Sequence, residues 1–400
     1  MPAENPSHVG LTAKAGLHFV LLFGAVNLFA DFSYEGARSV SGPFLALLGA
    51  SGFVAGAVGG LGELSGYALR LVSGRWADRS HRYWLITGLG YLVQMLAIPL
   101  LALAASWQAA AALILLERMG KAIRNPPRDV MLSEAGRHMG VGWAFGINEA
   151  LDQIGAFLGP LAVAAIYALH ADYRLAFVWL AGPGAMVLLL VLSARLSFPE
   201  AGRIAPEAEA DGDGAYPKIF WWYAAGAALV GFGFADYALI AFHFAKSHAL
   251  SPTAIPIAYA FAMLTGGAGA LLFGRLFDRF GLTVLAPAIL LCVFFAPLSF
   301  LGTGAIAATG VLLWGLGLGV QESVMAAAVA TMIPASRRAS AYGIFTAIFG
   351  VAWFLGSALE GALYDVSIPA LVGLSVIAQL LAIPFILKAA RKPPGGPSAG

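Results

Sequence analysis

Apolar runs of about 20 residues, the length that crosses a bilayer as a helix, recur along this chain with only short polar breaks between them. We expect six spans before one hydrophilic segment, near residues 16–42, 50–73, 84–104, 108–128, 142–168 and 174–196. Six more are expected after it, near 218–245, 252–274, 282–302, 305–328, 341–364 and 367–388. Because no open sheet edge can face lipid, the predicted fold is all-α with twelve transmembrane helices.

The composition also favours an integral membrane protein. Hydrophobic residues make up 60% of the chain and charged residues only 11%, whereas a soluble domain carries roughly 25% charge. The single cysteine, Cys292, lies in an apolar run, which excludes disulfides and thiolate metal sites. The seven histidines show no metal-binding spacing, so we expect neither a metal nor a cofactor.

The distribution of basic residues predicts the orientation. With a cytoplasmic N-terminus, all but three of the 23 Lys and Arg residues fall in or beside cytoplasmic segments. The exceptions are Arg38, Arg174 and Lys246. The polar start MPAENPSHVGLTAKAG has no basic n-region, so we interpret the first apolar run as a retained span rather than a signal peptide. The sequence therefore predicts a multi-pass protein of the cell (inner) membrane with both termini cytoplasmic.

The hydrophilic segment divides the chain into two halves. Residues 197–217 are rich in Pro, Gly and acidic side chains, which is typical of a solvated linker. We expect an N-terminal six-helix bundle over 1–196, a C-terminal six-helix bundle over 218–390 and a disordered tail over 391–400.

The two halves resemble each other in sequence. AFGINEALDQIGAFLGP (144–160) aligns without a gap with AYGIFTAIFGVAWFLGS (341–357), FADF aligns with FADY, and GRWADR with GRLFDR. Equivalent helices run the same way in both halves, so the repeat is parallel. Such duplication about an axis along the membrane normal is a transporter architecture, with the site between the halves near the midplane.

With this repeat and the segment GRWADRSHR between spans two and three, the chain resembles the major facilitator superfamily. The family signature is Gly-x-x-x-Asp-Arg/Lys-x-Gly-Arg-Arg/Lys, and the first copy matches it at Gly74, Asp78, Arg79 and Arg82. His81 and Tyr83 depart from it. The second copy matches at Gly274, Asp278, Arg279 and Gly281. The resemblance implies a gating latch that holds the cytoplasmic side closed; the alternative is a basic segment that only sets topology.

A second element of the same family lies in the fifth span. GAFLGP, with Gly155, Gly159 and Pro160, resembles the Gly-x-x-x-Gly-Pro element found most often in proton-coupled exporters, although Val163 and Ala164 replace the Gly-Gly that should follow. The two glycines form a flat face for close helix packing, and Pro160 loosens the backbone beyond it. The alternative is ordinary packing of small residues.

Charged side chains follow the first apolar run without a break. Asp31, Glu35 and Arg38 are spaced i, i+4 and i+7, so they share one face of the first span. A charge at the bilayer centre costs about 2.5–3.5 kcal/mol, but in this family the first and fourth spans of each half line a wet central cavity. Asp31 and Glu35 are one turn apart, so we expect coupled titrations, as proton coupling requires. Alternatively the span ends before Glu35, and Asp31 makes only a helix-packing hydrogen bond.

Three more carboxylates complete the candidate coupling set. Glu149 and Asp152 share a face of the fifth span, and Asp236 of the seventh span is the counterpart of Asp31. The proton-coupling or cavity candidates are Asp31, Glu35, Arg38, Glu149, Asp152 and Asp236.

The substrate-binding candidates come from both halves. Arg118, Lys121 and Arg124 share a face of the fourth span, where they can pair with the acidic residues or bind an anionic substrate. We expect Pro126 and Pro127 to end this helix and to leave Arg128 at the interface. The second half offers a more apolar wall with Tyr237, His243, Trp314 and Glu322, although aromatic residues in membrane helices are more often packing residues or interfacial anchors.

These features favour a secondary active transporter that works by alternating access and exports a small organic or amphiphilic compound against protons. No Walker-type nucleotide loop is present in the sequence. Proton-coupled uptake and facilitated diffusion are the alternatives. A membrane enzyme would need a convergent catalytic constellation, which is not visible, and a receptor would not require Asp31 and Glu35. The expected partners are a small-molecule substrate, protons and the lipid bilayer, with no nucleic acid, and the resemblance implies a monomer.

Overall fold

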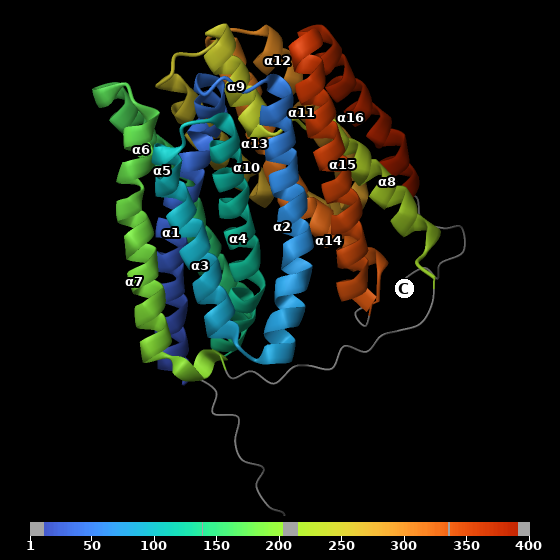
Figure 1. Cartoon of the computed structure of the whole chain (residues 1–400). Helices are drawn as coiled ribbons and strands as arrows, with labels where there is room; N and C mark the ends of the chain where they lie inside the picture. Colours follow the sequence, from blue (N-terminus) through green and yellow to red (C-terminus); the bar gives the residue numbers. More distant parts are fainter. Residues whose placement is uncertain (1–11, 138, 203–214, 335–336, 391–400) are drawn as a thin grey trace, which may run out of the picture.

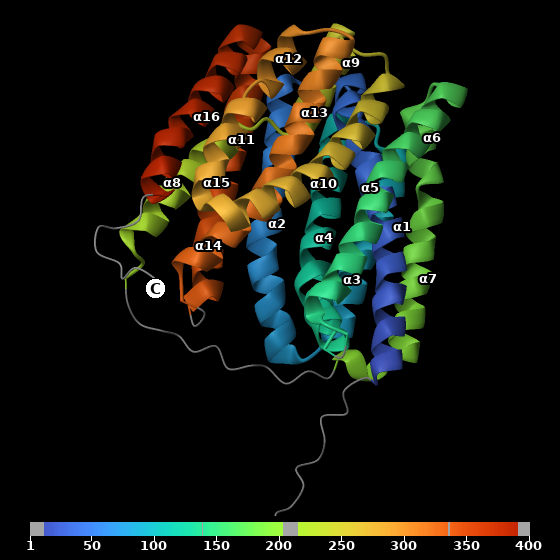
Figure 2. The same ribbon diagram turned by 180° about the vertical axis from the view of Figure 1, so that it is seen from behind.

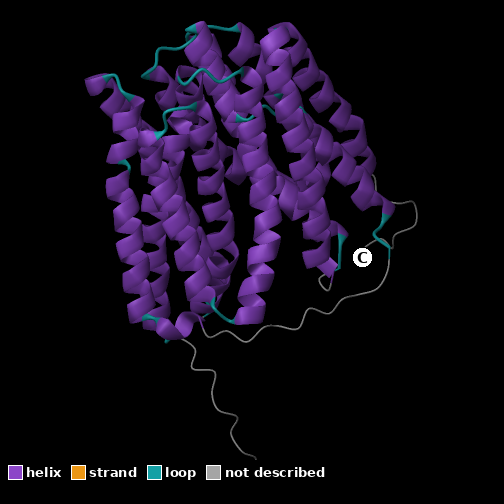
Figure 3. Ribbon diagram, in the orientation of Figure 1, coloured by secondary structure: helices purple, strands orange, loops and turns teal. Residues whose placement is uncertain are grey.

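The computed structural model describes residues 12–137, 139–202, 215–334 and 337–390. Across these ranges all regular secondary structure is helical and no strand occurs (Figure 3). The helices of the first half, coloured blue to green, lie on one side of the molecule, and most of those of the second half, coloured yellow to red, lie on the other (Figures 1 and 2). The predicted all-α architecture is therefore confirmed for the described part of the chain.

The first half begins with long helices, several of which start at a capping side chain. Thr12, Ser51 and Ser106 accept hydrogen bonds from the first turns of the helices that follow them. The elements are α1 (Ala13–Leu47), α2 (Gly52–Ser80), α3 (Tyr83–Leu100) with the 3-10 turn η1 (Leu101–Leu103), α4 (Trp107–Ala135), α5 (Val141–His170), α6 (Tyr173–Trp179), α7 (Ala181–Ser197) and the 3-10 turn η2 (Pro199–Gly202).

The second half is more interrupted. Its elements are α8 (Lys218–Phe232), α9 (Tyr237–Ser247), α10 (Ala254–Phe280), the 3-10 turn η3 (Gly281–Val284), α11 (Leu285–Cys292), α12 (Phe295–Leu301), α13 (Ala305–Val320), the π-helical segment η4 (Gln321–Met325), α14 (Ala326–Met332), α15 (Arg338–Val366) and α16 (Ile368–Ala390).

Nine segments of the described chain are long and apolar enough to cross a membrane. One of them, Ala254–Leu301, has 48 residues and combines α10, α11 and α12. The 29-residue helices α2 and α4 are not among the nine, because glycines and charged side chains lower their hydropathy. The molecule is thus a multi-pass membrane protein. The two helices that are not among the nine, α2 and α4, contain charged side chains that lie inside the bundle.

One alternative and two expectations about helix boundaries are wrong. The first span does not end before Glu35, because α1 continues to Leu47. The fourth does not end at Pro126 and Pro127, because α4 continues through both to Ala135. The seventh is not one helix, because the stretch 233–236 separates α8 from α9.

The seventh span is broken where side chains of α16 and α13 donate hydrogen bonds to its backbone carbonyls. The Gly233 carbonyl accepts hydrogen bonds from Ser375 Oγ at 2.5 Å and Gln379 Nε2 at 3.0 Å, and the Ala235 carbonyl accepts one from Trp314 Nε1 at 2.9 Å. A helix can end where its last carbonyls find other donors.

Close helix packing holds α1 against α5 in the first half. A Cβ atom on Gly155 or Gly159 would fall on the backbone carbonyl oxygen of Leu28 or Phe32 of α1. The two glycines therefore form the flat packing face that their spacing predicts. Pro160 is buried within the same helix.

The main helix pairs that join the halves are α2 with α15, α1 with α9, and α5 with α10, and α2 with α9 and α1 with α10 are also in contact. The two ends of the molecule are named after the helices that connect there. At the α1–α2 end, α1 ends and α2 begins; the α2–α3 end is the opposite one. At the α1–α2 end a Cβ atom on Gly42 of α1 would meet the carbonyl oxygen of Ala238 of α9. The halves are in tightest contact there.

Candidate functional site

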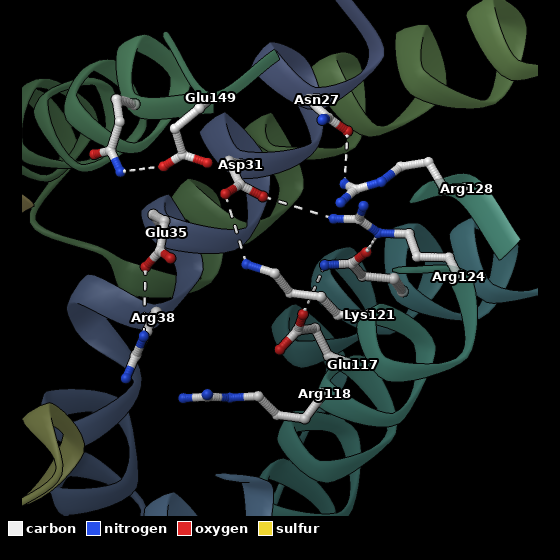
Figure 4. A network of polar contacts seen from close by, with 12 residues as sticks. Asn27, Asp31, Glu35, Arg38, Glu117, Arg118, Lys121, Arg124, Arg128 and Glu149 are labelled. Carbon is white, nitrogen blue, oxygen red and sulfur yellow. Dashed lines mark hydrogen bonds and ion pairs between the residues drawn. The ribbon is translucent and has the colours of Figure 1, made fainter. Parts of the chain in front are cut away.

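A network of charged and polar side chains from α1, α4 and α5 lies inside the first half (Figure 4). Because α1 is continuous, it places Asp31, Glu35 and Arg38 on one inward face, as their spacing predicts. Asp31 is 3% exposed and Glu35 6%. These groups are therefore in the interior, where each needs a partner.

Asp31 is the centre of the first part of the network. Its Oδ2 lies 3.6 Å from Lys121 Nζ and its Oδ1 lies 3.7 Å from Arg124 Nη2. The carboxyl of Asp152, on α5, lies close enough to the Asp31 carboxyl for the two charges to act on each other. Two carboxyls can share a hydrogen bond only when one of them carries a proton. Asp31 thus faces two cations and one potential proton partner.

Arg124 and Lys121 are held very differently. The Arg124 side chain is fully buried, its Nε donates to Gln94 Oε1 at 2.7 Å, and its Nη1 donates to Tyr91 OH at 3.1 Å. Lys121 pairs with Asp31, its ammonium lies 3.8 Å from the centre of the Tyr34 ring, and its side chain is 21% exposed. Arg124 is therefore a buried countercharge held by several contacts, whereas Lys121 is partly exposed and has fewer contacts.

Further polar contacts connect Gln94 and Tyr91, the partners of Arg124, to other residues. Gln94 Nε2 donates to Glu117 Oε1 at 3.0 Å, and Asn27 Oδ1 accepts hydrogen bonds from Tyr91 OH and Arg128 Nη1, each at 3.1 Å. Arg128 lies inside α4 and is half-buried. The lysine and arginines of α4 thus form a continuous polar face toward α1.

The second part of the network centres on Arg38 and joins the two halves. Its Nη2 lies 3.5 Å from Glu63 Oε1 of α2 and 3.5 Å from Asp236 Oδ2 of the second half. Its Nη1 lies 3.9 Å from Glu35 Oε2, which also accepts a hydrogen bond from Tyr259 OH of α10. Asp236, a partner of Arg38, and Tyr259, a partner of Glu35, come from the other half, so this cluster stabilises contact between the halves.

Neighbouring residues complete the same cluster. Arg118 Nη1 pairs with Glu63 Oε1. Asp236 Oδ1 accepts a hydrogen bond from Ala238 N at 2.9 Å, so the aspartate caps α9 while its other oxygen faces Arg38. Asp31 and Asp236 are equivalent in the repeat but have different structural roles. Asp31 pairs with cations of its own half, whereas Asp236 caps a helix and faces a cation of the other half.

The two remaining acidic candidates, one from each half, are exposed. Glu149 is exposed and accepts a hydrogen bond from Gln153 Nε2 at 2.9 Å. Glu322 is also exposed and lies in the π-helical segment of the second half, where Glu149 and Lys121 are among the charges that act on it. π-Helical segments occur frequently at functional sites.

The three other candidates of the second half lie in its core. Trp314 and Tyr237 are fully buried, and His243 is 3% exposed. Each makes a hydrogen bond there: Trp314 to the Ala235 carbonyl, Tyr237 to the Ile255 carbonyl at 3.0 Å, and His243 Nδ1 with Tyr364 OH at 3.2 Å. In this arrangement they pack the second half and do not line the space between the halves.

The signature residues lie at the α2–α3 end, mostly inside helices rather than in a connection. Gly74, Asp78 and Arg79 lie in the last turns of α2, and Asp78 accepts a hydrogen bond from Tyr83 OH at 2.9 Å. Arg82 directly precedes α3 and makes no side-chain capping hydrogen bond there, and the second copy, Gly274, Asp278 and Arg279, lies at the end of α10. Among the contacts of the described residues, none joins these charged groups to the other half.

Sequence reasoning did not nominate several residues of the network. Glu63 and Glu117 carried a usable signal, because each is an acidic residue inside an apolar run. Tyr259 and Asn27 carried none, since a tyrosine or asparagine in a membrane helix is common. Within the described chain, no three His, Cys, Asp or Glu side chains are grouped closely enough to hold a metal ion.

The family model described as Major Facilitator Superfamily matches residues 25–357. The chain belongs to this superfamily. It is also 40% identical to an uncharacterized protein of Mycobacterium tuberculosis (strain ATCC 25618 / H37Rv) over 401 residues, which cover 98% of each chain. An uncharacterized MFS-type transporter of Methanocaldococcus jannaschii is 33% identical over 154 residues, 38% of each chain.

Solved structures with the same fold include transporters of different kinds. The nucleoside transporter NupG superposes with a TM-score of 0.73 at 15% identity, over 92% of this chain and 98% of its own. A bacterial homologue of the iron transporter ferroportin in an inward-facing state gives 0.70 at 15% identity, over 94% and 99%. These likenesses show the fold. With the family match, they make this chain a secondary transporter of the membrane.

Proposed function

We propose that this transporter couples the movement of protons to the export of a small organic or amphiphilic compound. The observation that carries the proposal is the group formed by Asp31, Asp152 and Lys121. It holds two carboxyls and one ammonium that is only partly held in place, next to the space between the halves. Asp31 has the immobile Arg124 as a permanent countercharge, so the labile interactions are those with Lys121 and Asp152.

In such a group, loss of a proton from one carboxyl can be compensated by a new contact with a cation. When Asp152 carries the proton, it can donate to Asp31. When the proton leaves, two adjacent carboxylates repel each other, and Lys121 is the cation within reach that can compensate both. The position of Lys121, and with it the charge presented to a substrate, then depends on the protonation of the pair. That dependence is the link between proton movement and substrate binding that coupling requires.

Export is favoured over uptake by the Gly155, Gly159 and Pro160 element, which resembles that of proton-coupled exporters. The exposed carboxylates Glu149 and Glu322 beside the more apolar second half fit an amphiphilic compound. Proton-coupled uptake uses the same carboxyls and is distinguished by the direction of proton movement.

The proposal includes a complete topology. We place twelve crossings in the chain by adding α2 and α4 to the apolar segments and by counting Ala254–Leu301 as two. The bundles cover 1–196 and 218–390, joined by the cytoplasmic linker 197–217. Both termini face the cytoplasm, the α1–α2 end faces outward, and the protein works as a monomer in the cell (inner) membrane. The signature residues of the α2–α3 end then form the cytoplasmic latch.

Purified protein in liposomes with a trapped pH-sensitive dye tests the function. A panel of drugs, sugars, organic acids and metabolites is added one compound at a time to wild type and to Asp31→Asn. We expect some compound to move protons through wild type but not through the variant, and the sign of the pH change separates antiport from symport. The matched control is Asp172→Asn, which removes an exposed carboxylate but keeps an oxygen to cap α6. Equal proton movement in wild type and Asp31→Asn would contradict the proposal.

A further inference from the structure

The contact between α2 and α15 joins the two halves over most of their length. Cβ atoms built on glycines show the register: Gly52 meets Tyr364 and Asp365, Gly56 meets Gly361 and Ser357, and Gly343 of α15 meets Leu71. Low numbers of α2 thus lie beside high numbers of α15. The two helices are antiparallel, and each has 29 residues.

Asp365 caps the first turn of α2 from the other half. Its Oδ1 accepts a hydrogen bond from Gly52 N at 2.8 Å, and its Oδ2 accepts one from Phe53 N at 2.9 Å. Ser51 Oγ accepts from Val54 N at 3.2 Å. The first N–H groups of a helix have no acceptor within the helix, so Asp365 satisfies two of them. Its negative charge also lies at the positive end of the helix dipole.

An acidic residue occupies the corresponding place at the opposite end of the pair. Asp365 is the last residue but one of α15, and Asp78 lies two residues before the end of α2. Because the helices are antiparallel, Asp78 is at the end where α15 begins. In this structure Asp365 is bonded across the halves, whereas Asp78 accepts its hydrogen bond from Tyr83 of its own half.

The rest of the α2–α15 contact near Asp365 is made by glycines of α2, which have no side chains to interlock with α15. Gly52, Gly56 and Gly60 of α2 are packed against Tyr364, Ser357 and Phe354 of α15. Glycines allow close approach without side chains that interlock, so the two helices can separate without repacking a core. The two hydrogen bonds of Asp365 are a directional contact at this end. Asp365 is exposed, so water can replace the carboxylate when the helices part.

We propose that Asp365 is a gating residue, which holds the α1–α2 end of the two halves closed by capping α2. It acts in alternation with Asp78 at the α2–α3 end. The inference rests on alternating access, which the family implies, but not on proton coupling or on the direction of transport. Removal of the Asp365 carboxylate then favours the arrangement in which the α1–α2 end is open.

Distances between spin labels on the two halves test this inference in purified protein. A Cys292→Ser background carries one label pair at the α1–α2 end, at the exposed positions Leu47 and Leu301, and in a second sample one pair at the α2–α3 end, at Trp143 and Phe280. Distance distributions are then measured for wild type, Asp365→Ala and Asp78→Ala.

Asp365→Ala is expected to raise the ratio of open to closed α1–α2 ends by about fivefold, which corresponds to the loss of a helix cap of typical strength. Asp365→Asn keeps one acceptor oxygen and is expected to give a smaller shift in the same direction. It replaces the alanine variant in this experiment if that variant does not fold. Asp78→Ala is expected to shift the distributions in the opposite direction.

The control is Asp172→Ala, which removes an acidic cap that acts within one half and is expected to leave both distributions unchanged. Unchanged distances in Asp365→Ala, or a shift in the same direction as for Asp78→Ala, would overturn the inference. Because the labels report conformation and not flux, failure of proton coupling in the liposome assay leaves this result interpretable.

Discussion

The two halves use the same sequence element in different ways. FAD ends at Asp31 in the first half and at Asp236 in the second. Asp31 lies in the middle of the continuous helix α1 and faces Lys121 and Arg124 of its own half. Asp236 lies at a helix break, caps α9 and faces Arg38 of the other half. One aspartate is paired with cations of its own half, and the other connects the halves.

This difference reflects what surrounds each copy. In the first half, α1 is packed against the polar face of α4, which supplies countercharges. In the second half, donors of α16 and α13 bind the carbonyls of Gly233 and Ala235, and the rings of Phe234, Tyr237, Tyr259 and Trp314 form a cluster. A duplicated fold can thus hold a network of charged side chains in one copy and an aromatic cluster in the other, on equivalent helices.

The largest expected effect tests the fixed cation of the first half. Arg124→Met leaves Asp31, Gln94 and Tyr91 without this partner, and loss of one member of a buried charge pair costs about 3–5 kcal/mol. Thermal unfolding in detergent is expected to show a large fall in Tm. Lys121→Met, the control on the same helix, removes a partly exposed partner and is expected to lower Tm much less. Equal falls would show that Arg124 is not the structural cation.

Equivalent glycines of the two halves test whether the repeat extends to packing. Gly159 of α5 and Gly356 of α15 are aligned in the repeat, and a Cβ atom on either would fall on a carbonyl oxygen, of Phe32 and of Phe232 respectively. Gly159→Ala and Gly356→Ala are each expected to destabilise the protein by about 1–3 kcal/mol, the usual cost of overpacking. Gly373→Ala has open space for the methyl group and serves as the control. A harmless change at only one of the pair would break the symmetry.

Two carboxyls inside the helical bundles, one half-buried and one fully buried, show the contrast in charge between the halves. Glu63 is paired with Arg38 and Arg118, whereas Glu360 of the second half is fully buried, and the described residues supply neither of its oxygens with a hydrogen-bond partner. Glu63→Gln is expected to lower the free energy of unfolding by about 1–3 kcal/mol because Arg118 loses its paired anion and Arg38 loses one of its three. Glu360→Gln is expected to be neutral or stabilising. Chemical unfolding in detergent distinguishes these outcomes, and a larger loss for Glu360→Gln would reverse the assignment.

The smallest effect concerns the hydrogen bond between the halves. Tyr259→Phe removes only the donor to Glu35, and such a bond contributes about 0.5–1.5 kcal/mol, or somewhat more to a charged acceptor. Tm is expected to fall slightly, and the Leu47–Leu301 distance distribution to broaden. Tyr237→Phe, the control, removes a bond that lies within the second half. If it broadened the same distribution equally, Tyr259 would have no special role between the halves.

The sequence predicted the helical architecture and the inward face of α1 well, because both depend on local hydropathy and on helical spacing. Asp31, Glu35 and Arg38 lie together because three residues on one helix need no tertiary information. The break before Asp236 was not predictable, since it depends on Ser375 and Gln379, which are more than a hundred residues away in the chain.

The partners of the candidate residues were the least predictable part. Nothing local marks Tyr259 as the donor to Glu35. Asp365, at the end of its span, has the sequence pattern of an ordinary surface acid. Trp314 and Tyr237 were nominated for a cavity wall, but their polar atoms bind backbone carbonyls in the core. Contacts between the halves depend on how two bundles pack, and a single sequence does not encode that in any short pattern.

Infrared spectroscopy of the carboxyl groups tests the central claim, that Asp31 and Asp152 share the coupling proton, without knowledge of the substrate. Difference spectra between acid and alkaline samples are compared for wild type, Asp31→Asn, Asp152→Asn and Asp236→Asn. We predict a band of a protonated carboxyl that titrates in wild type and in Asp236→Asn and is lost in both Asp31→Asn and Asp152→Asn. The same titrating band in all four proteins would place the proton elsewhere and contradict the account.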